Sequence, residues 1–288
     1  MRFRRRKRLW RNVLFLLIGL FGAYIVACWY LAKMYLSPPR ERVPSMAAYT
    51  RVTDIINPPN WASPHLVAGK QTGDTLYVMV HGYRGTVAHW KEIGEDLMAK
   101  HKDVVLIEMP GHGDSPEDAC GFGPKESDAV VTATKWALSR YHKRPKVVLV
   151  GVSMGGAAAW LATEKHPELF DAICTEGAYA KLDEAIDGWF DNRLAGGRYS
   201  LYPVKAFACR MSGIDPSKIN PVEAAKHWRG KPALIVHCEN DALMGESHAK
   251  RLAEASGGDL WVIENAEHAQ GAGDARAEYV TCLLQLAK

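Results

Sequence analysis

Residues 146–156 read KVVLVGVSMGG, and this stretch decides how the rest of the chain is interpreted. Its first seven residues are almost continuously apolar, which is typical of a strand covered on both faces of a sheet. Gly151 and Gly155 then flank Ser153 in the pattern G-x-S-x-G, and glycines permit a tight turn where side chains would clash. The stretch therefore predicts a strand, a sharp turn that raises the Ser153 hydroxyl above the sheet, and a helix.

An alternation of strands and helices extends in both directions from this turn. Short apolar runs bounded by turn residues predict strands, and stretches with helical spacing separate them. The pattern predicts an α/β fold, with a mostly parallel sheet and helices on both faces. The expected strands are residues 75–81, 103–108, 146–152, 171–175, 232–238 and 259–264, and the expected helices are residues 90–101, 125–142, 155–166, 247–255 and 275–287.

Residues 179–230 interrupt the alternation between the fourth and fifth expected strands. The segment is rich in aromatic and apolar side chains, including Trp189, Phe190 and Tyr202. We expect it to form a small, mostly helical lid within a domain that covers residues 65–288. An apolar lining would suit an acyl chain, and the alternative is that these side chains only pack the lid onto the core.

Two polar residues follow the last two expected strands. A serine hydroxyl needs a base that is held by a third group, and in this context the order along the chain is Ser, acid, His. Asp241 comes just after the fifth strand and His268 just after the sixth. The sequence therefore predicts Ser153 as nucleophile, His268 as base and Asp241 as the acid that orients it. Glu176, after the fourth strand, is the alternative acid.

The same chemistry requires N–H donors for the negative charge that develops on a carbonyl oxygen. The amide of Met154, directly after the nucleophile, is one expected donor of this oxyanion hole. The loop after the first strand, His81-Gly82-Tyr83-Arg84-Gly85, is expected to supply the other, through the amide of Tyr83. His81 and Arg84 are interpreted as structural residues.

The N-terminal residues have the character of a membrane anchor. Residues 1–11 hold seven basic residues, and the following 20 residues, Val13 to Ala32, carry no charge. A helix of that length spans about 30 Å, the thickness of a bilayer core. We therefore predict a basic cytoplasmic tail (1–11), a transmembrane helix (12–36) and a Pro-rich tether (37–64). The excess of positive charge before the span places the main domain outside the cytoplasm.

Two other interpretations of this segment remain open. A cleaved signal peptide would also be basic and then apolar, although the run is long and no A-x-A site follows it. A lipoprotein signal is the second, because Ile25-Val26-Ala27-Cys28 loosely resembles a lipobox. The chain also lacks an N-x-S/T sequon, which favours the periplasmic side of a bacterial inner membrane over a eukaryotic lumen.

Charge and composition exclude several classes of function. Residues 1–42 hold ten basic residues and one acid, whereas the other 246 residues hold 26 basic and 31 acidic ones. A main domain that is mildly acidic argues against a nucleic-acid partner. No metal-ligand spacing is present, so no metal and no cofactor are expected. Cys174 and Cys238 fall on expected strands as buried thiols, and Cys120 and Cys209 are a possible disulfide pair.

These motifs resemble those of the α/β-hydrolase superfamily. The resemblance covers roughly residues 70–288 and rests on HGYRG (81–85), GHGDS (111–115), GVSMGG (151–156), Asp241 and His268. Residues 111–115 together with GPKESD (123–128) are similar to a branch of small membrane-anchored serine hydrolases that includes bacterial esterases and protein depalmitoylases. The resemblance implies hydrolysis of an ester or thioester through an acyl-serine intermediate, without cofactor. Cys238 departs from the pattern, because many relatives have Gly there.

The sequence thus predicts a membrane-anchored serine hydrolase that acts on a small-molecule or lipid ester. Two alternatives stay open. An amidase or peptidase would use the same three residues, and a non-catalytic anchored binding protein would keep the fold without turnover. Fold alone does not fix a substrate, and the oligomeric state is not predicted.

Overall fold

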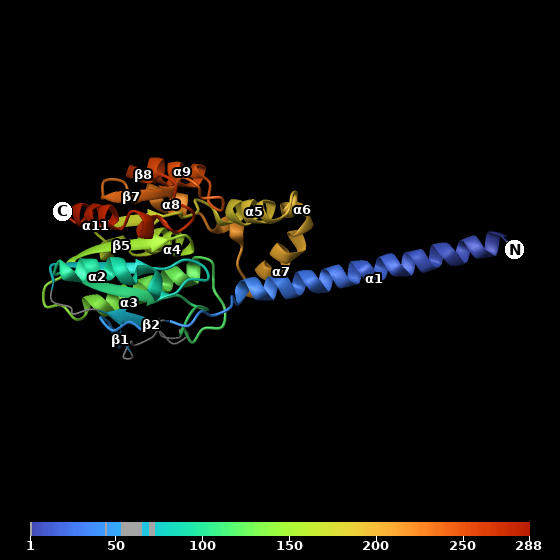
Figure 1. The fold of residues 1–288 in the computed structure, drawn as a ribbon, viewed down its shortest axis with the longest axis horizontal. Coiled ribbons are helices and arrows are strands. Elements are labelled where there is room, and N and C mark those ends of the chain that lie inside the picture. Colours follow the sequence, from blue (N-terminus) through green and yellow to red (C-terminus); the bar gives the residue numbers. More distant parts are fainter. Residues whose placement is uncertain (1, 44, 53–64, 69–72) are drawn as a thin grey trace.

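A central twisted sheet organises the domain (Figure 1). The computed structural model describes residues 2–43, 45–52, 65–68 and 73–288. In these residues eight strands lie in the order β1-β2-β4-β3-β5-β6-β7-β8. The six strands β3 to β8 are parallel, and β1 and β2 are antiparallel additions at one edge, beside β4. The strands are β1 (Thr50–Val52), β2 (His65–Ala68), β3 (Thr75–Val80), β4 (Asp103–Glu108), β5 (Lys146–Val152), β6 (Ala172–Glu176), β7 (Ala233–Cys238) and β8 (Asp259–Ile263).

Helices cover both faces of the sheet, and each face has its own hydrophobic core. One core packs the sheet against α3 (Pro124–Leu138), α4 (Met154–Lys165), α8 (Pro221–Lys226) and α9 (Glu246–Ser256). The other packs it against α2 (Lys91–Ala99) and α11 (Arg276–Leu286). Because both faces are covered, β3 and β4 are buried at every position, which explains why the strands are continuous apolar runs.

The predicted fold class is confirmed: the chain has the α/β-hydrolase fold, with six parallel strands. Each of the six predicted strands is present within one residue of its expected ends. The lid segment contains α5 (Leu182–Arg193), α6 (Gly197–Ser200) and α7 (Tyr202–Ser212). It also contains α8, but this helix packs on α4 and α9. It supplies Val222 and Ala225 to the hydrophobic core on the face of the sheet that α3 and α4 cover. The lid proper therefore consists of α5, α6 and α7.

The Pro-rich segment 37–64 differs from the expected tether. Within it, Thr50–Val52 form β1 and pair with β2. Tyr49 is buried, and its hydroxyl donates to the Lys91 carbonyl at 2.9 Å. The described part of this segment therefore lies against the domain, and sequence reasoning missed both edge strands because runs of three and four residues carry little periodicity. Residues 53–64 lie outside the described residues.

A single long helix, α1 (Arg2–Leu36), precedes the domain and projects away from it in Figure 1. The predicted basic tail continues this helix. Residues Arg6–Leu36 reach a mean hydropathy of 2.2 over their most apolar 18 residues, so α1 is long and apolar enough to span a membrane. Signal sequences and buried helices of soluble proteins share these properties, although only 6% of that window is buried here.

The C-terminal end of α1 is packed against the lid. Cys28 and Ala32 of α1 are buried together with Phe190 of α5 and Val204 of α7. The Tyr24 hydroxyl donates to the carbonyl of Ser200 in α6, nearer the free end of α1. The printed contacts of α1 with the lid thus lie between Tyr24 and its C-terminal end, and the N-terminal part of the helix projects away from the domain (Figure 1).

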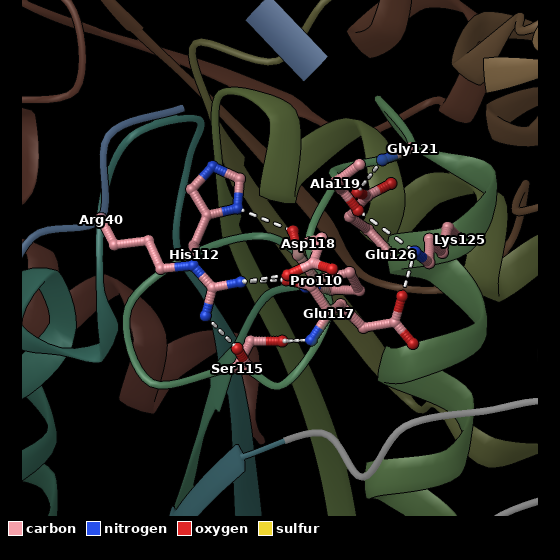
Figure 2. A network of polar contacts seen from close by, with 10 residues as sticks. All are labelled: Arg40, Pro110, His112, Ser115, Glu117, Asp118, Ala119, Gly121, Lys125 and Glu126. Atoms are coloured by element: carbon pink, nitrogen blue, oxygen red, sulfur yellow. Dashed lines mark hydrogen bonds and ion pairs between the residues drawn. The ribbon is translucent and has the colours of Figure 1, made fainter. Parts of the chain in front are cut away.

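Residue Arg40, just after α1, fastens the chain to the loop that follows β4 (Figure 2). Its guanidinium donates to the carbonyls of Ser115 and Glu117 and lies 3.6 Å from the Asp118 carboxylate. The far end of the same loop is held by the buried carboxylate of Glu126, which accepts from the amides of Gly121 and Gly123. The loop of residues 109–123 is therefore held near its middle by Arg40 and at its C-terminal end by Glu126.

Candidate active site

Ser153 occupies the turn between β5 and α4, at the carboxyl end of the sheet. Its backbone has φ 54° and ψ −122°, a conformation that L-residues rarely adopt. The two flanking glycines explain why this turn can form. A Cβ on Gly155 would lie 2.3 Å from the His81 carbonyl oxygen, and one on Gly151 would lie 2.6 Å from that of Gly155. The strained backbone holds the Ser153 side chain clear of the strand and at the N-terminus of α4.

The structure brings Ser153 together with the predicted base and acid. His268 Nε2 lies 2.9 Å from Ser153 Oγ, and His268 Nδ1 lies 2.6 Å from Asp241 Oδ2. The other oxygen of Asp241 accepts from the amides of Leu243 and Met244, each at 2.8 Å. The Asp241 side chain is fully buried and that of His268 is 17% exposed. Nδ1–H of His268 therefore donates to Asp241, which leaves Nε2 able to accept the Ser153 proton.

Two glycines make room for this arrangement. Gly177 follows β6 with φ 57°, and a Cβ there would lie 3.1–3.3 Å from the His268 ring and the Asp241 carboxylate. Gly82 follows β3, and a Cβ there would lie 3.0 Å from Ser153 Cβ. The backbone of the loop after β3 therefore runs directly beside the Ser153 side chain. Gly177 was not among the sequence-predicted residues, although its place after a strand end was a usable signal.

The two predicted oxyanion donors belong to the turn that carries Ser153 and to the loop whose Gly82 lies beside it. Met154 is the first residue of α4, and the first N–H groups of a helix have no acceptor within that helix. Tyr83 comes after Gly82, which approaches Ser153 most closely. The loop before Tyr83 is held by His81, whose Nδ1 lies 2.8 Å from the Gly82 carbonyl oxygen. Both amides are thus carried by backbone whose position is fixed by the neighbouring turn.

His81 itself is fully buried, and its ring nitrogens have partners outside the triad. Its Nε2 accepts from the Met109 amide at 3.0 Å and lies 2.8 Å from Glu108 Oε1. This agrees with the interpretation of His81 as a structural residue. Glu108, which sequence reasoning did not single out, forms the buried partner at the end of β4.

Glu176, the alternative acid, has a different environment. Its side chain is buried at the end of β6, where Oε1 accepts from the Gly271 amide at 2.9 Å and from the Cys238 thiol at 3.4 Å. Burial raises the pKa of this carboxyl above its usual range. It is Asp241 and not Glu176 that touches the His268 ring, and Glu176 instead supports the loop that carries His268. Cys238 and Cys174 are buried as expected, and the thiols of all six cysteines are free, so Cys120 and Cys209 are not bonded.

An aromatic wall connects this site with the lid and with α1. The Tyr83 ring stacks on Phe122, with 5.4 Å between centroids, and meets Trp189 of α5 edge-on at 6.3 Å. Trp189 in turn packs against Tyr35 near the end of α1, at 4.7 Å. The Tyr83 hydroxyl donates to the Tyr35 carbonyl at 2.9 Å. Burial of the Tyr83 ring raises the pKa of its phenol above its usual range.

Comparisons with known proteins agree with this architecture. A sequence profile described as the alpha/beta hydrolase fold matches residues 77–207. The chain is 27% identical over 227 residues to a dihydrolipoyllysine-residue acetyltransferase component of an acetoin cleaving system from Pseudomonas putida, covering 68% of this chain and 59% of that protein. It is 30% identical over 120 residues to a 2-succinyl-6-hydroxy-2,4-cyclohexadiene-1-carboxylate synthase from Citrobacter koseri, covering 41% and 44%. The chain thus spans about half the length of these curated relatives.

Solved structures show the same fold at low sequence identity. An esterase from Pyrococcus furiosus superposes with a TM-score of 0.70 at 19% identity, covering 88% of this chain and 97% of its own. An esterase from Exiguobacterium antarcticum has a TM-score of 0.58 at 15% identity, covering 78% and 98%. Together with the profile match, these neighbours support the α/β-hydrolase fold for this chain.

Proposed function

We propose that this protein is a serine hydrolase that cleaves carboxylic esters or thioesters through an acyl-serine intermediate. The observation that carries the proposal is the chain of hydrogen bonds from Ser153 through His268 to Asp241 on the strained turn after β5. A packed serine that served only the fold would need neither an oriented imidazole nor a buried carboxylate behind it. The esterase fold of the structural neighbours is consistent with this chemistry.

The first half of the reaction follows from the geometry. His268 Nε2, 2.9 Å from Ser153 Oγ, takes the hydroxyl proton as the oxygen attacks the substrate carbonyl carbon. Asp241 holds the imidazole in the required tautomer and stabilises the imidazolium that forms. The amides of Met154 and Tyr83 donate to the carbonyl oxygen as it becomes negative. His268 then gives its proton to the leaving alcohol or thiol, and Ser153 is left acylated.

The second half returns the enzyme to its resting state. A water molecule takes the place of the leaving group, and His268 removes one of its protons while the hydroxide attacks the acyl carbon. The same two amides stabilise the second tetrahedral intermediate. When it collapses, the proton on His268 returns to Ser153 Oγ and the carboxylic acid departs. No step needs a cofactor.

We further propose that α1 anchors the enzyme in a membrane, with residues 1–11 in the cytoplasm and the domain on the other side. Support comes from the uncharged run of residues 13–32, the excess of basic residues before it, and the exposure of α1 over most of its length. An anchored hydrolase would meet amphiphilic esters, so lipids and acylated proteins are the substrate classes to examine.

Labelling with a fluorophosphonate probe and hydrolysis of p-nitrophenyl esters test the proposed chemistry. Full-length protein in detergent micelles is compared with Ser153→Ala and with Ser247→Ala, a matched control at an exposed serine of α9. We expect Ser153→Ala to abolish labelling and to lower turnover by at least 10³-fold, and Ser247→Ala to behave as the wild type. Turnover of the matching p-nitroanilides separates an esterase from an amidase.

The opposite results would also be informative. A folded wild type that neither labels nor hydrolyses any ester, in micelles or in lipid, would leave the non-catalytic binding protein as the better description. Equal labelling of wild type and Ser153→Ala would place the reactive group elsewhere.

A further inference from the structure

An apolar cavity lies between the end of α1 and the lid. The empty space in and in front of it, open solvent at its mouth included, is about 510 Å³, and its wall is almost entirely nonpolar. The lining includes Tyr35 and Leu36 of α1, residues of α5 such as Trp189, and residues of α7 such as Ala208. Phe122 of the loop after β4 and two residues after α7 complete it. The seam between α1 and the lid is thus not fully packed, although the same helices bury Phe190 and Val204 nearby.

The charge around this cavity favours a hydrocarbon chain over a polar ligand. Lys205 is the charged side chain in the lining, and it lies 2.6 Å from Asp183 and 2.7 Å from Asp187. Its charge is therefore neutralised by two carboxylates of α5 and is not available to an anionic headgroup. Pockets for small molecules combine an apolar lining with a few converging polar groups, whereas this one offers only the lining.

The cavity shares two aromatic side chains with the loop beside the candidate active site. Phe122 and Trp189 line the cavity, and both rings pack against the ring of Tyr83. The amide of Tyr83 is the proposed oxyanion donor beside Ser153. A chain that filled the cavity would therefore contact the same side chains that hold the oxyanion loop.

The α1 side of the cavity lies close to the end of the proposed span, because Tyr35 and Leu36 follow Ala32 by three and four residues. If residues 13–32 cross the membrane, Tyr24 lies about 12 Å deeper in the bilayer than Ala32, measured along the helix. Its hydroxyl contacts the carbonyl of Ser200 in α6, so the tip of the lid reaches into the outer leaflet. Arg198 at this tip is paired with Asp191. Large apolar side chains exposed there are Leu194, Tyr199 and Tyr202, at 52%, 79% and 63%.

From these observations we propose that the cavity between α1 and the lid binds the acyl chain of an ester drawn from the outer leaflet. The proposal rests on the function proposed above, and it names the substrate class: long-chain acyl esters embedded in lipid. Tyr35 and Leu36 at the end of α1 belong to the lining, so a chain that follows α1 out of the lipid would meet the cavity there. The lid and the anchor together form most of its walls.

Filling the cavity tests this assignment. Ala208 lines it from α7, whereas Ala206 on the same helix is exposed and is not part of the lining. Full-length protein in lipid nanodiscs is compared as wild type, Ala208→Phe and Ala206→Phe, with p-nitrophenyl butyrate and palmitate as substrates. We expect Ala208→Phe to lower kcat/KM for palmitate at least tenfold and to leave the butyrate value within twofold. Ala206→Phe should change neither.

A binding measurement keeps the test independent of catalysis. In Ser153→Ala protein, 9,10-dibromostearate is titrated and quenching of tryptophan fluorescence is followed, since Trp189 lines the cavity. We expect quenching in the parent and in Ala206→Phe, and at least a tenfold weaker apparent affinity in Ala208→Phe. The smaller Ala208→Leu replaces Ala208→Phe if the latter loses butyrate turnover.

The outcomes separate the two proposals. Equal losses for palmitate and butyrate, or equal quenching of the Ala208 and Ala206 variants, would overturn the acyl site. A wild type that hydrolyses neither ester yet shows quenching that Ala208→Phe abolishes would contradict the proposed hydrolase and support the acyl site.

Discussion

The carboxyl edge of the sheet, where the strands end and Ser153 lies, and the seam that joins α1 to the lid are built in opposite ways. At the edge, polar atoms have fixed partners at hydrogen-bonding distance, and two glycines allow the backbone to approach. The seam is held by apolar side chains around a cavity, with a few bonds to carbonyls of α1. Under the two proposals, one region carries out the bond chemistry on any ester and the other chooses among acyl chains. Changes at the edge should therefore affect all substrates equally, and changes at the seam should not.

The largest expected effect is that of Asp241→Asn. The amide oxygen can still accept from Leu243 and Met244, so the fold should persist. The amide nitrogen, however, favours the wrong tautomer of His268, and we expect kcat/KM to fall about 10⁴-fold for butyrate and palmitate alike. Glu176→Gln is the control, with less than a threefold change, because its oxygen can still accept from Gly271. A reversed ranking would make Glu176 the functional acid.

Gly177→Ala should have the second largest effect. The methyl group would press on the His268 ring and the Asp241 carboxylate, and a displaced base costs about 100-fold in rate. The positive φ of 57° adds a cost of about 1 kcal/mol in stability. Gly230→Ala separates the two effects, since Gly230 has φ 88° and open space around it. It should lose a similar amount of stability, measured by thermal unfolding, and keep full activity.

An intermediate effect is expected from His112, in the loop between the edge and the seam. Burial lowers the pKa of His112 to about 3, from 6.5, and its Nε2 has no partner among the described residues. Below pH 6.5 the unfolded chain binds a proton there that the folded one excludes, so folded-state stability is lost as pH falls. The loss is about 1.4 kcal/mol per pH unit. Between pH 7 and 5, wild type should therefore lose about 2 kcal/mol more than His112→Asn.

The comparison is made from unfolding curves of both proteins at each pH. Taking the difference between them removes contributions from other groups, including Glu126 and Glu176, whose raised pKa values act in the opposite direction. Parallel pH dependences for wild type and variant would show that His112 titrates normally in the folded state.

The smallest effect is predicted for Tyr83→Phe, which removes the hydrogen bond to the Tyr35 carbonyl. Such a bond contributes about 1 kcal/mol, so Tm should fall by about 2–4 °C while butyrate turnover stays within threefold. In protein that begins at residue 37 the partner is gone, and the substitution should then cost nothing. Tyr49→Phe, which breaks a bond to Lys91 instead, should cost the same in both proteins. A Tyr83→Phe cost that survives truncation would argue against the seam contact.

The two regions also differ in how far they can be predicted from sequence. The parallel strands were predictable because strands buried on both faces are continuous apolar runs, and Asp241 and His268 because they follow strand ends in a fixed chain order. Chemistry of this kind depends on residue type and position, which a sequence shows directly.

The seam was not predictable for a physical reason. Cys28 and Ala32 have the composition of any apolar helix, and nothing local shows that they face Phe190 and Val204. The same holds for Glu108, whose partner His81 is 27 residues away in the chain, and for β1 and β2, which are too short to show a period. Such features depend on which surfaces meet in space.

The attachment of α1 to the domain bears on how far from a membrane surface the Ser153 site can lie. A hydrolase on a flexible tether sweeps a range of heights above a membrane, and recognition alone decides what it cleaves. Here α1 is held by the lid along its last turns and by Arg40 at the loop after β4, so with α1 in a bilayer the site stands at one height. Under the proposed function, ester bonds of lipid-embedded molecules at that level would be presented to Ser153, and identical bonds held deeper in the leaflet would not. Selection by depth then precedes selection by shape.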